Sequence, residues 1–355
     1  MDDHIAIGNA QNLFFVENNV VTFLPTGQKI LDKLKDLMQI TLKKNGFTPV
    51  SSHKTSDPLV KCETYNNICR RLVIEEHRLP CKLFEITSMK NNNTQEGHVN
   101  NSLVNLDENT TLIGSIYCLP KIEALTIEFS NLLSILNLFG KATGLTFTYE
   151  FRHSTQVTEV STMVLSHLGG ILHSIDDMND SYDFMSIVVH VYNEMMNQNY
   201  CIGHIKILTE DTGIFYQNND KSDFESPFII QFILINSFEK LFVPLLEQNK
   251  KLPFLLNHNQ INIIPINETI DEKTFKYIQE VQKYFNMFSS NIDLRKGDFV
   301  AKINDSERYE YVFVVGKKEV ETNTITYYYN NKTYIKKTPS EVRNMLIKEY
   351  FSFLE

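Results

Sequence analysis

The chain lacks tryptophan, is poor in cysteine and glycine, and carries no excess of positive charge. Its 355 residues include 5 Cys, 13 Gly and no Trp, and the formal net charge is −9. An odd number of cysteines without a Cys-x-x-Cys pair argues against a disulfide framework and predicts free thiols in a reducing compartment. The negative charge excludes a general attraction to nucleic acid. No apolar run approaches the roughly 20 residues that span a bilayer, so we expect no membrane partner.

The amino terminus carries no visible targeting signal, and positive charge is concentrated toward the carboxy terminus. The start, Met1 to His4, has neither the apolar core of a signal peptide nor the Arg-rich character of a transit peptide. Cytosol is the default prediction, and mitochondria stay open as an alternative for which no transit peptide is visible. From Arg295 onward there are 11 Lys and Arg residues against 9 Asp and Glu. Any nucleic-acid interface should therefore be local and lie in this carboxy-terminal part.

What the chain does have is enough apolar material for two domains, with 24 Phe, 16 Tyr and 42% hydrophobic residues. The stretch from 227 to 265 predicts where the domains meet. An apolar run at 228–235 predicts a buried strand, and apolar positions at helical spacing from Phe238 to Leu246 predict a helix behind it. A new buried strand then begins at Ile261. We predict domains over 1–256 and 257–355.

Alternation and helical spacing predict an α/β order in both domains. In the first we expect a hairpin at 13–23, a helix through Leu42 that stops at Asn45–Gly46, and a loop-like, Asn-rich insertion over about 90–111. Further elements are expected as strands at 112–118, 145–152 and 158–165 and helices at 121–138 and 178–196. In the second domain the expected order is strand 261–266, helix 271–288, strand 292–294, helix 299–304, strands 311–315 and 324–329, and helix 339–350.

Four of these stretches resemble class II aminoacyl-tRNA synthetases of the threonyl and prolyl branch. Leu24–Pro25–Thr26–Gly27 is similar to the entry of their first motif, and a strand ending in Arg152 to that of the second. Asn236–Ser237–Phe238–Glu239–Lys240 is similar to the third, and the run 314–321 to their anticodon-binding domain. The resemblance implies a core with a mixed, mainly antiparallel sheet, a carboxy-terminal α/β anticodon-binding-like domain, and a homodimer formed through the first motif.

The catalytic residues that the resemblance implies are only partly present. Arg152 stands where the family binds ATP, but Ser154 replaces the Glu that contacts adenine. At the third motif Glu239 is retained, whereas Lys240 replaces an Arg, and a lysine cannot form a planar bidentate fork. The region 200–227 is also short where the family builds its amino-acid pocket. We predict no catalytic residues, with Arg152, Glu239 and Lys240 as vestigial ATP-site positions, and ATP with Mg²⁺ as cofactors only if the chain is a ligase.

The zinc site of threonyl enzymes is likewise incomplete by resemblance. That site uses one Cys and two His. Cys118 matches the cysteine, but Gln231 and Ser174 stand near the two histidine positions. We predict no metal.

Three functions stay open from the sequence. The first is a non-catalytic paralogue that binds nucleic acid or protein, similar in architecture to the accessory subunit of mitochondrial DNA polymerase. The second is a compact, divergent threonyl- or prolyl-tRNA ligase, which Arg152 and Glu239 favour. The third is a ribosome- or tRNA-associated scaffold. The expected surface for tRNA, DNA or a protein partner, unless these are merely solvated cations, is formed by Arg295, Lys296, Lys317, Lys318, Lys336 and Lys337.

Overall fold

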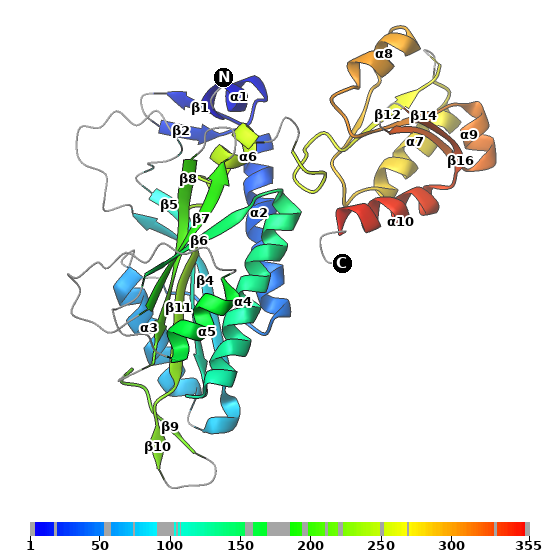
Figure 1. Ribbon diagram of the computed structural model, residues 1–355. Helices are drawn as coiled ribbons and strands as arrows, with labels where there is room; N and C mark the ends of the chain where they lie inside the picture. The colour runs from blue at the N-terminus through cyan, green and yellow to red at the C-terminus, as the bar shows by residue number, and fades with distance from the viewer. Residues whose placement is uncertain are drawn as a thin grey trace. The chain divides into compact units, whose positions relative to one another are not determined.

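A computed structural model describes residues 4–17, 20–52, 58–73, 75–90, 103, 106, 108–152, 159–168, 185–193, 198–209, 212–218, 223–248, 252–267, 270–329 and 332–351. The chain divides into two compact units, residues 1–250 and 251–355 (Figure 1). Each unit has its own sheet and its own apolar core. Side chains of 20, 58–60, 193, 198, 335 and 336 lie outside the described set, as do the predicted Ser154, Ser174 and most of the Asn-rich insertion.

The first unit is built on a seven-stranded sheet in the order β3-β4-β5-β11-β8-β7-β6. Its β3–β4 pair is parallel and the other pairs are antiparallel, which confirms the predicted mixed, mainly antiparallel α/β class. The strands are β3 Thr48–Pro49, β4 Cys81–Lys90, β5 Glu108–Cys118, β6 Phe147–Arg152, β7 Met185–Asn193, β8 Gln198–Leu208 and β11 Phe228–Ile235.

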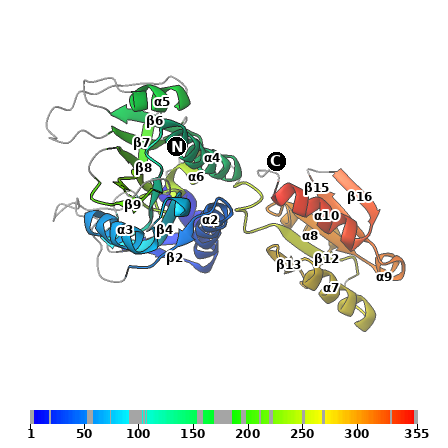
Figure 2. The same ribbon diagram turned by 90° about the horizontal axis from the view of Figure 1, so that it is seen from below.

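The predicted buried strand, β11, lies inside this sheet between β5 and β8. Even-numbered positions such as Ile230 and Phe232 face the helices α2 (Pro25–Lys44) and α4 (Ile122–Thr143). Odd-numbered Gln231 faces the other side, which α3 (Pro58–Leu72) partly covers (Figure 2). The sheet therefore has one apolar face, toward α2 and α4. Its other face carries an apolar cluster under α3 that includes Ile229, beside a polar part around Gln231 that we call the polar face.

Helix α4 is long and apolar enough to cross a membrane by length and composition alone. In the structure it packs on the sheet and on α2, and eleven of its residues are buried, Phe129 and Leu136 among them. It begins after Lys121 and ends at Gly144, whose φ of 72° is left-handed and suits glycine. This is the packing of a core helix.

Smaller elements close the ends of the first unit. The predicted hairpin is confirmed as β1 (Phe14–Glu17) and β2 (Val20–Phe23), and it packs through Phe14 and Phe23 on Phe242. Phe242 opens the short helix α6 (Phe242–Gln248), which starts four residues later than the predicted helix because 238–241 form turns. The remaining elements are α1 His4–Ala10, a 3-10 turn at Glu76–Arg78, and the small hairpin β9 Tyr216–Gln217 and β10 Phe224–Glu225.

Two predictions in this unit are wrong. The helix expected over 178–196 is strand β7 in its described part, since Ile187, Val188, Val189 and Val191 are buried on both faces of a central strand. The strand expected at 158–165 is helix α5 (Glu159–His167), so β6 pairs with β7 instead. The insertion is also shorter than expected, because Lys90 and Glu108 pair at the ends of β4 and β5.

The second unit has a five-stranded sheet in the order β13-β12-β14-β15-β16, with the first three strands parallel and the last two antiparallel. Helices α7 and α10 cover one face over an apolar core that includes Ile263, Phe313 and Tyr327. The elements are β12 Ile261–Pro265, α7 Glu272–Tyr284, β13 Ser290–Ile292, α8 Phe299–Asp305, β14 Tyr311–Val315, α9 Lys317–Thr322, β15 Ile325–Tyr329, β16 Lys332–Lys337 and α10 Pro339–Tyr350.

Candidate functional site

The second unit carries a polar cleft on the face of its sheet opposite α7 and α10. The cleft has a volume of about 290 Å³ and lies between the strands β12 and β13, the helix α8 and the segment that leads into β14. Alternation along β12 sends Asn262 to this face while Ile261 and Ile263 enter the core. The cleft is lined by Asn262, Asn291, Ile292, Asp293, Leu294, Arg295, Asp305, Ser306, Arg308 and Tyr309.

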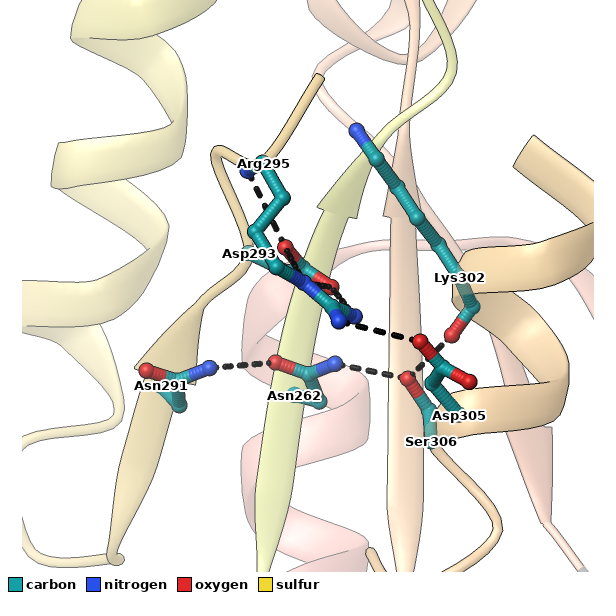
Figure 3. A network of polar contacts seen from close by, with 7 residues as sticks. All are labelled: Asn262, Asn291, Asp293, Arg295, Lys302, Asp305 and Ser306. Carbon is teal, nitrogen blue, oxygen red and sulfur yellow. Dashed lines mark hydrogen bonds and ion pairs between the residues drawn. The ribbon is translucent and has the colours of Figure 1, made fainter. Parts of the chain in front are cut away.

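Arg295 is held between two carboxylates at one end of the cleft (Figure 3). Its Nη2 lies 2.6 Å from Oδ2 of Asp293, and its Nη1 lies 2.9 Å from Oδ2 of Asp305. The hydrogen bond from Arg295 holds the pKa of Asp293 below its ordinary value, although burial opposes this shift. The Arg295 side chain is nevertheless 60% exposed. The plane of its guanidinium is thus fixed in direction while one side stays open to a ligand.

A row of amides forms the floor of the cleft. Nδ2 of Asn291 donates to Oδ1 of Asn262 at 2.9 Å, and Nδ2 of Asn262 donates to Oγ of Ser306 at 2.7 Å. The Ser306 hydroxyl in turn donates to the carbonyl of Lys302 at 2.6 Å. Figure 3 shows the Lys302 ammonium pointing away from this network. The chain of bonds fixes two planar amides side by side, that of Asn262 buried and that of Asn291 exposed.

Arg308 and Tyr309 form the exposed rim. The Arg308 guanidinium carbon lies 5.3 Å from the centre of the Tyr309 ring, a cation–π arrangement. With Asp293 and Asp305 balancing Arg295 and Arg308, the cleft residues have no net charge. Such a cleft suits a planar, uncharged group with hydrogen-bonding edges better than a phosphate.

The predicted cations lie along one edge of the same sheet. Lys296 follows β13, Lys317 and Lys318 follow β14, and Lys337 ends β16, which is antiparallel to β15. The strand directions bring all these ends to the carboxyl edge of β12, β13 and β14, and the four lysines are exposed. Of the predicted residues Arg295 alone lines the cleft, and the side chain of Lys336 lies outside the described residues.

Sequence reasoning missed most of the cleft. Asn262 offers a usable signal, because it is a polar residue inside the otherwise apolar strand Ile261–Pro265 and is 2% exposed. Arg308 and Tyr309 follow a polar turn and carry no comparable signal in the sequence. Their position depends on how α8 returns to β14.

The polar face of the first unit gathers the vestigial ATP-site positions. Strand register places Arg152, Ser186, Lys206, Gln231 and Ser115 in one row across five strands. The next row holds Glu150 and His204, among others. The structure therefore brings Arg152 to the same face as Gln231, the residue that the resemblance places at a zinc-binding histidine.

Arg152 is paired within its own strand. Its Nε lies 2.8 Å from Oε1 of Glu150, whose second oxygen lies 3.2 Å from Nε2 of His190. Burial raises the pKa of Glu150, but the hydrogen bonds from Arg152 and His190 outweigh it and hold that pKa below its ordinary value. Arg152 thus has a carboxylate partner in place of a phosphate.

Lys240 lies in the turn after β11 and is partly buried. Burial lowers the pKa of Lys240, and its charge opposes the rise that burial causes in the pKa of Cys201. Arg152 acts on Cys201 in the same sense, so both cations lie within electrostatic reach of one thiol. Sγ of Cys201 lies 3.6 Å from Nε2 of His204. The assignment of Arg152 and Lys240 as vestigial ATP-site residues stays a prediction.

Glu239 has a structural role. Its oxygens accept bonds from the backbone N–H of Thr110 at 3.0 Å, the Thr110 hydroxyl at 2.6 Å and the Ser237 hydroxyl at 3.1 Å. The side chain is buried, and these contacts tie the start of β5 to the turn after β11. Its carboxylate thus accepts three hydrogen bonds from within the protein.

The strands β8 and β11 are direct neighbours in the sheet of the first unit. β8 bonds directly to β11, with Ile229 opposite Leu208 and Ile233 opposite His204. Cys118 lies opposite Phe228 and Gln231 opposite Ser115, so these two aligned zinc positions point to opposite faces. Burial raises the pKa of the Cys118 thiol to about 12. Within the described residues, no three His, Cys, Asp or Glu side chains come together as a metal site.

Comparison with known proteins points to one class of fold. The RNA-binding domain of threonyl-tRNA synthetase from Cryptosporidium parvum has a TM-score of 0.80 at 19% identity and covers 99% of each chain. Prolyl-tRNA synthetase from the same organism, solved with L-proline and AMP, has a TM-score of 0.65 at 12% identity over 99% of this chain and 77% of that one. No protein-family model matches the chain.

The relatives found by sequence are threonine–tRNA ligases. A cytoplasmic threonine–tRNA ligase from Homo sapiens is 31% identical over 146 residues, or 39% of this chain and 20% of the relative. A probable cytoplasmic threonine–tRNA ligase from Arabidopsis thaliana is 34% identical over 112 residues, 30% of this chain and 24% of the relative. The matched part spans about a fifth to a quarter of these relatives.

The fold of the chain is therefore that of the threonyl- and prolyl-tRNA synthetase structures, which is consistent with a class II aminoacyl-tRNA synthetase-like protein. Its sequence relatives are threonine–tRNA ligases, to which it is similar over about a third of its length.

Proposed function

We propose that this chain binds an unpaired stretch of tRNA through its carboxy-terminal unit and does not activate amino acids. The polar cleft supports the proposal most, because it offers two fixed amides, an oriented guanidinium and an Arg–Tyr rim without net charge. Bases in unpaired RNA are recognised by stacking on aromatic or guanidinium planes and by hydrogen bonds to their edges. A cleft near the lower end of ligand-pocket volumes, about 300 Å³, suits one base.

The exposed lysines along the carboxyl edge supply what the cleft lacks. Contacts to phosphate position a nucleic acid, whereas contacts to base edges specify its sequence. Lys317 and Lys318 stand beside the end of β14, and Lys296 follows the Arg295 that lines the cleft. A strand of RNA whose base enters the cleft has these cations within reach of its backbone.

Loss of amino-acid activation is supported by the polar face of the first unit. Transition-state stabilisation in phosphoryl chemistry needs cations aimed at phosphate oxygens. Arg152 is bound to Glu150, Glu239 is bound to Thr110, and Lys240 lacks the fork of an arginine. The connection from β8, which ends at Leu208, to β11, which begins at Phe228, is short where the resemblance places the amino-acid pocket.

The test is binding of the full chain to a tRNA transcript with a threonine anticodon, followed by fluorescence anisotropy at fixed salt. We expect Arg308→Glu to weaken binding about 10- to 100-fold, since one lost base contact costs about 1–3 kcal/mol. Lys317→Glu with Lys318→Glu should weaken binding for every transcript and reduce its salt dependence. Lys283→Glu is the matched charge reversal, because Lys283 is exposed on α7, over the opposite face.

Unchanged affinity in Arg308→Glu would remove the cleft from the interface. A loss of equal size in Lys283→Glu would show that charge alone drives binding and would contradict the proposed base readout.

A divergent threonyl- or prolyl-tRNA ligase is the second candidate, favoured by Arg152 and Glu239 at positions that the resemblance assigns to the family's second and third motifs. In that case ATP and Mg²⁺ bind at the polar face of the first unit. Arg152→Ala then removes amino-acid-dependent pyrophosphate exchange, an activity that the RNA-binding proposal expects to be missing already in the unmodified chain.

The homodimer and a protein partner are also proposals. A homodimer through α2 and β3 follows from the resemblance of the first motif, and an accessory role beside a polymerase or a ribosome needs a protein partner as well as RNA. Light scattering of the free chain tests the dimer, and a monomer at micromolar concentration would contradict it.

A further inference from the structure

Thr338 lies where the last strand of the second unit passes into its last helix. It follows Lys337, the final residue of β16, and it is the N-cap of α10. Its hydroxyl oxygen accepts a hydrogen bond from the backbone N–H of Glu341 at 3.3 Å and donates one to Oε2 of Glu341 at 2.9 Å. Thr338 is partly exposed, and Lys337 and Ser340 beside it are exposed. The hydroxyl therefore lies at the surface, bonded within the first turn of its own helix.

We propose that Thr338 is a phosphorylation site whose modification lowers the affinity of the second unit for RNA, an inference that rests on the RNA binding proposed above. Pro339 follows Thr338 directly, and Ser or Thr before Pro is the sequence that proline-directed protein kinases modify. Pro339 also favours an extended backbone at Thr338. The backbone is extended there, with φ −68° and ψ 151°, which is the form in which kinases bind their substrates.

The chemical step is the transfer of one phosphoryl group. A proline-directed kinase, with MgATP as its second substrate, positions Oγ1 of Thr338 to attack the γ-phosphorus. The new P–O bond forms as the bond to the β-phosphate oxygen breaks, so ADP leaves, and the hydroxyl proton passes through the kinase to solvent. No electron is exchanged, and the protein gains one phosphate ester.

Two other Ser or Thr residues of the chain precede a proline, in Thr48–Pro49 and Ser226–Pro227. Thr48–Pro49 forms strand β3 and is paired with β4, and Ser226 lies between β10 and β11. Both belong to the first unit, whereas Thr338 belongs to the second. They are therefore internal controls for the site.

A phosphate on Thr338 changes the charge of the edge that carries the exposed lysines. β16 is antiparallel to β15, which is antiparallel to β14, so β16 ends at the same edge as β14. Thr338 thus follows the edge residue Lys337 directly. A phosphothreonine carries about −1.5 to −2 charge at pH 7. It attracts Lys337 and repels the phosphates of a bound RNA, so the affinity for RNA falls.

The start of α10 stays capped after this change. Hydrogen bonds from Thr338, followed by the charge of Lys337, hold the pKa of Glu341 below its ordinary value. A phosphate repels this carboxylate, but its own oxygens accept hydrogen bonds from the backbone N–H groups of the first turn, where the helix dipole favours negative charge. The loss of RNA affinity can therefore be separated from unfolding of the helix.

The test treats the full chain with a purified mitogen-activated protein kinase, which is proline-directed, and MgATP. Mass spectrometry of the digest locates the phosphate, which we expect on Thr338. Affinity for the tRNA transcript with a threonine anticodon should then fall about 3- to 10-fold at ~50 mM salt and less at ~200 mM, because salt screens the added charge. The melting temperature should not fall.

Thr338→Asn is the decisive variant, since asparagine is a good N-cap residue but has no hydroxyl. After kinase treatment it should keep the tRNA affinity of the untreated chain. Thr48→Ala is the matched control and should lose affinity on treatment as the unmodified sequence does.

Phosphate on Thr48 or Ser226 but not on Thr338 would overturn the site. Phosphate on Thr338 with unchanged tRNA affinity at ~50 mM salt would overturn its effect. An untreated chain without affinity for tRNA would refute the proposed function and with it the effect of the phosphate, while the mass spectrum still tests the site.

Discussion

The buried ion pair under α3 gives the sharpest test of how the first unit is held together. Nζ of Lys61 lies 3.2 Å from Oε2 of Glu85, and their side chains are 0% and 6% exposed. Glu85 also accepts from the backbone N–H of Ser52 at 3.0 Å, the Ser52 hydroxyl at 2.8 Å and the Tyr65 hydroxyl at 3.1 Å. The pair joins helix α3 to strand β4 on the polar face of the sheet.

Removal of one partner leaves a buried charge without its counter-ion, which costs about 3–5 kcal/mol of unfolding free energy. For Lys61→Met we expect the lower end, about 3 kcal/mol, because three donors still bond Glu85. Replacement of both partners, in Lys61→Met with Glu85→Leu, removes the uncompensated charge. The double variant should therefore lie within about 1–2 kcal/mol of the unmodified chain, closer than either single variant.

The stability that the Glu85 carboxylate contributes should depend on pH. Burial raises the pKa of Glu85, but hydrogen bonds from Ser52 and Lys61 outweigh it and hold the pKa below its ordinary value of 4.5. A depressed carboxyl pKa contributes stability that is fully present above 4.5 and is lost as the pH falls through the folded-state pKa. Glu85→Gln should lack this part of the acid dependence.

The assay is urea unfolding followed by far-UV circular dichroism and tyrosine fluorescence, since the chain has no tryptophan. The transition of the first unit should move and that of the second should not. A cost below about 1 kcal/mol for Lys61→Met, or a double variant no more stable than either single variant, would refute the reasoning.

Three further outcomes follow from contacts elsewhere. Gly114→Ala should destabilise the first unit by about 1–3 kcal/mol in urea unfolding, because the new Cβ would lie 2.4 Å from the carbonyl oxygen of Leu83; a neutral effect would contradict the close strand packing. Glu239→Gln should cost about 1.5–3 kcal/mol in the same assay, as its charged bonds to Thr110 weaken; no loss would argue against a structural role. The pKa of Asp293 is depressed by its contact with Arg295, so tRNA affinity should fall as the pH drops through that pKa. Asp293→Asn should bind tRNA weakly at every pH tested. A pH-independent affinity in the unmodified chain would contradict a role for the Asp293–Arg295 ion pair in binding.

Most of the second unit could be predicted because each element is short and amphipathic. The helix from Pro339 to Tyr350 begins with a Thr338–Glu341 capping box, a signal that is visible in the sequence itself. The parallel strand at 261–266 was predicted from its apolar run. Helix α9 was missed because its six residues are too few to show a period.

The errors in the first unit have one physical cause. Ile187 to Val191 is an apolar run interrupted only by His190, and such a run fits one face of a helix and both faces of a buried strand equally well. Pairing with β6 and β8 decided the outcome, and pairing is a long-range property. The same limit hid the cleft, since Asn262, Asp305 and Arg308 are brought together by the return of α8 to the sheet.

Titration of ATP into the full chain by calorimetry, with Mg²⁺ and with threonine or proline present, tests the central claim most directly. The account predicts no saturable heat at millimolar ATP, because Arg152 and Glu239 are engaged within the protein. Saturable binding that an amino acid strengthens and that Arg152→Ala abolishes would contradict it and restore the ligase.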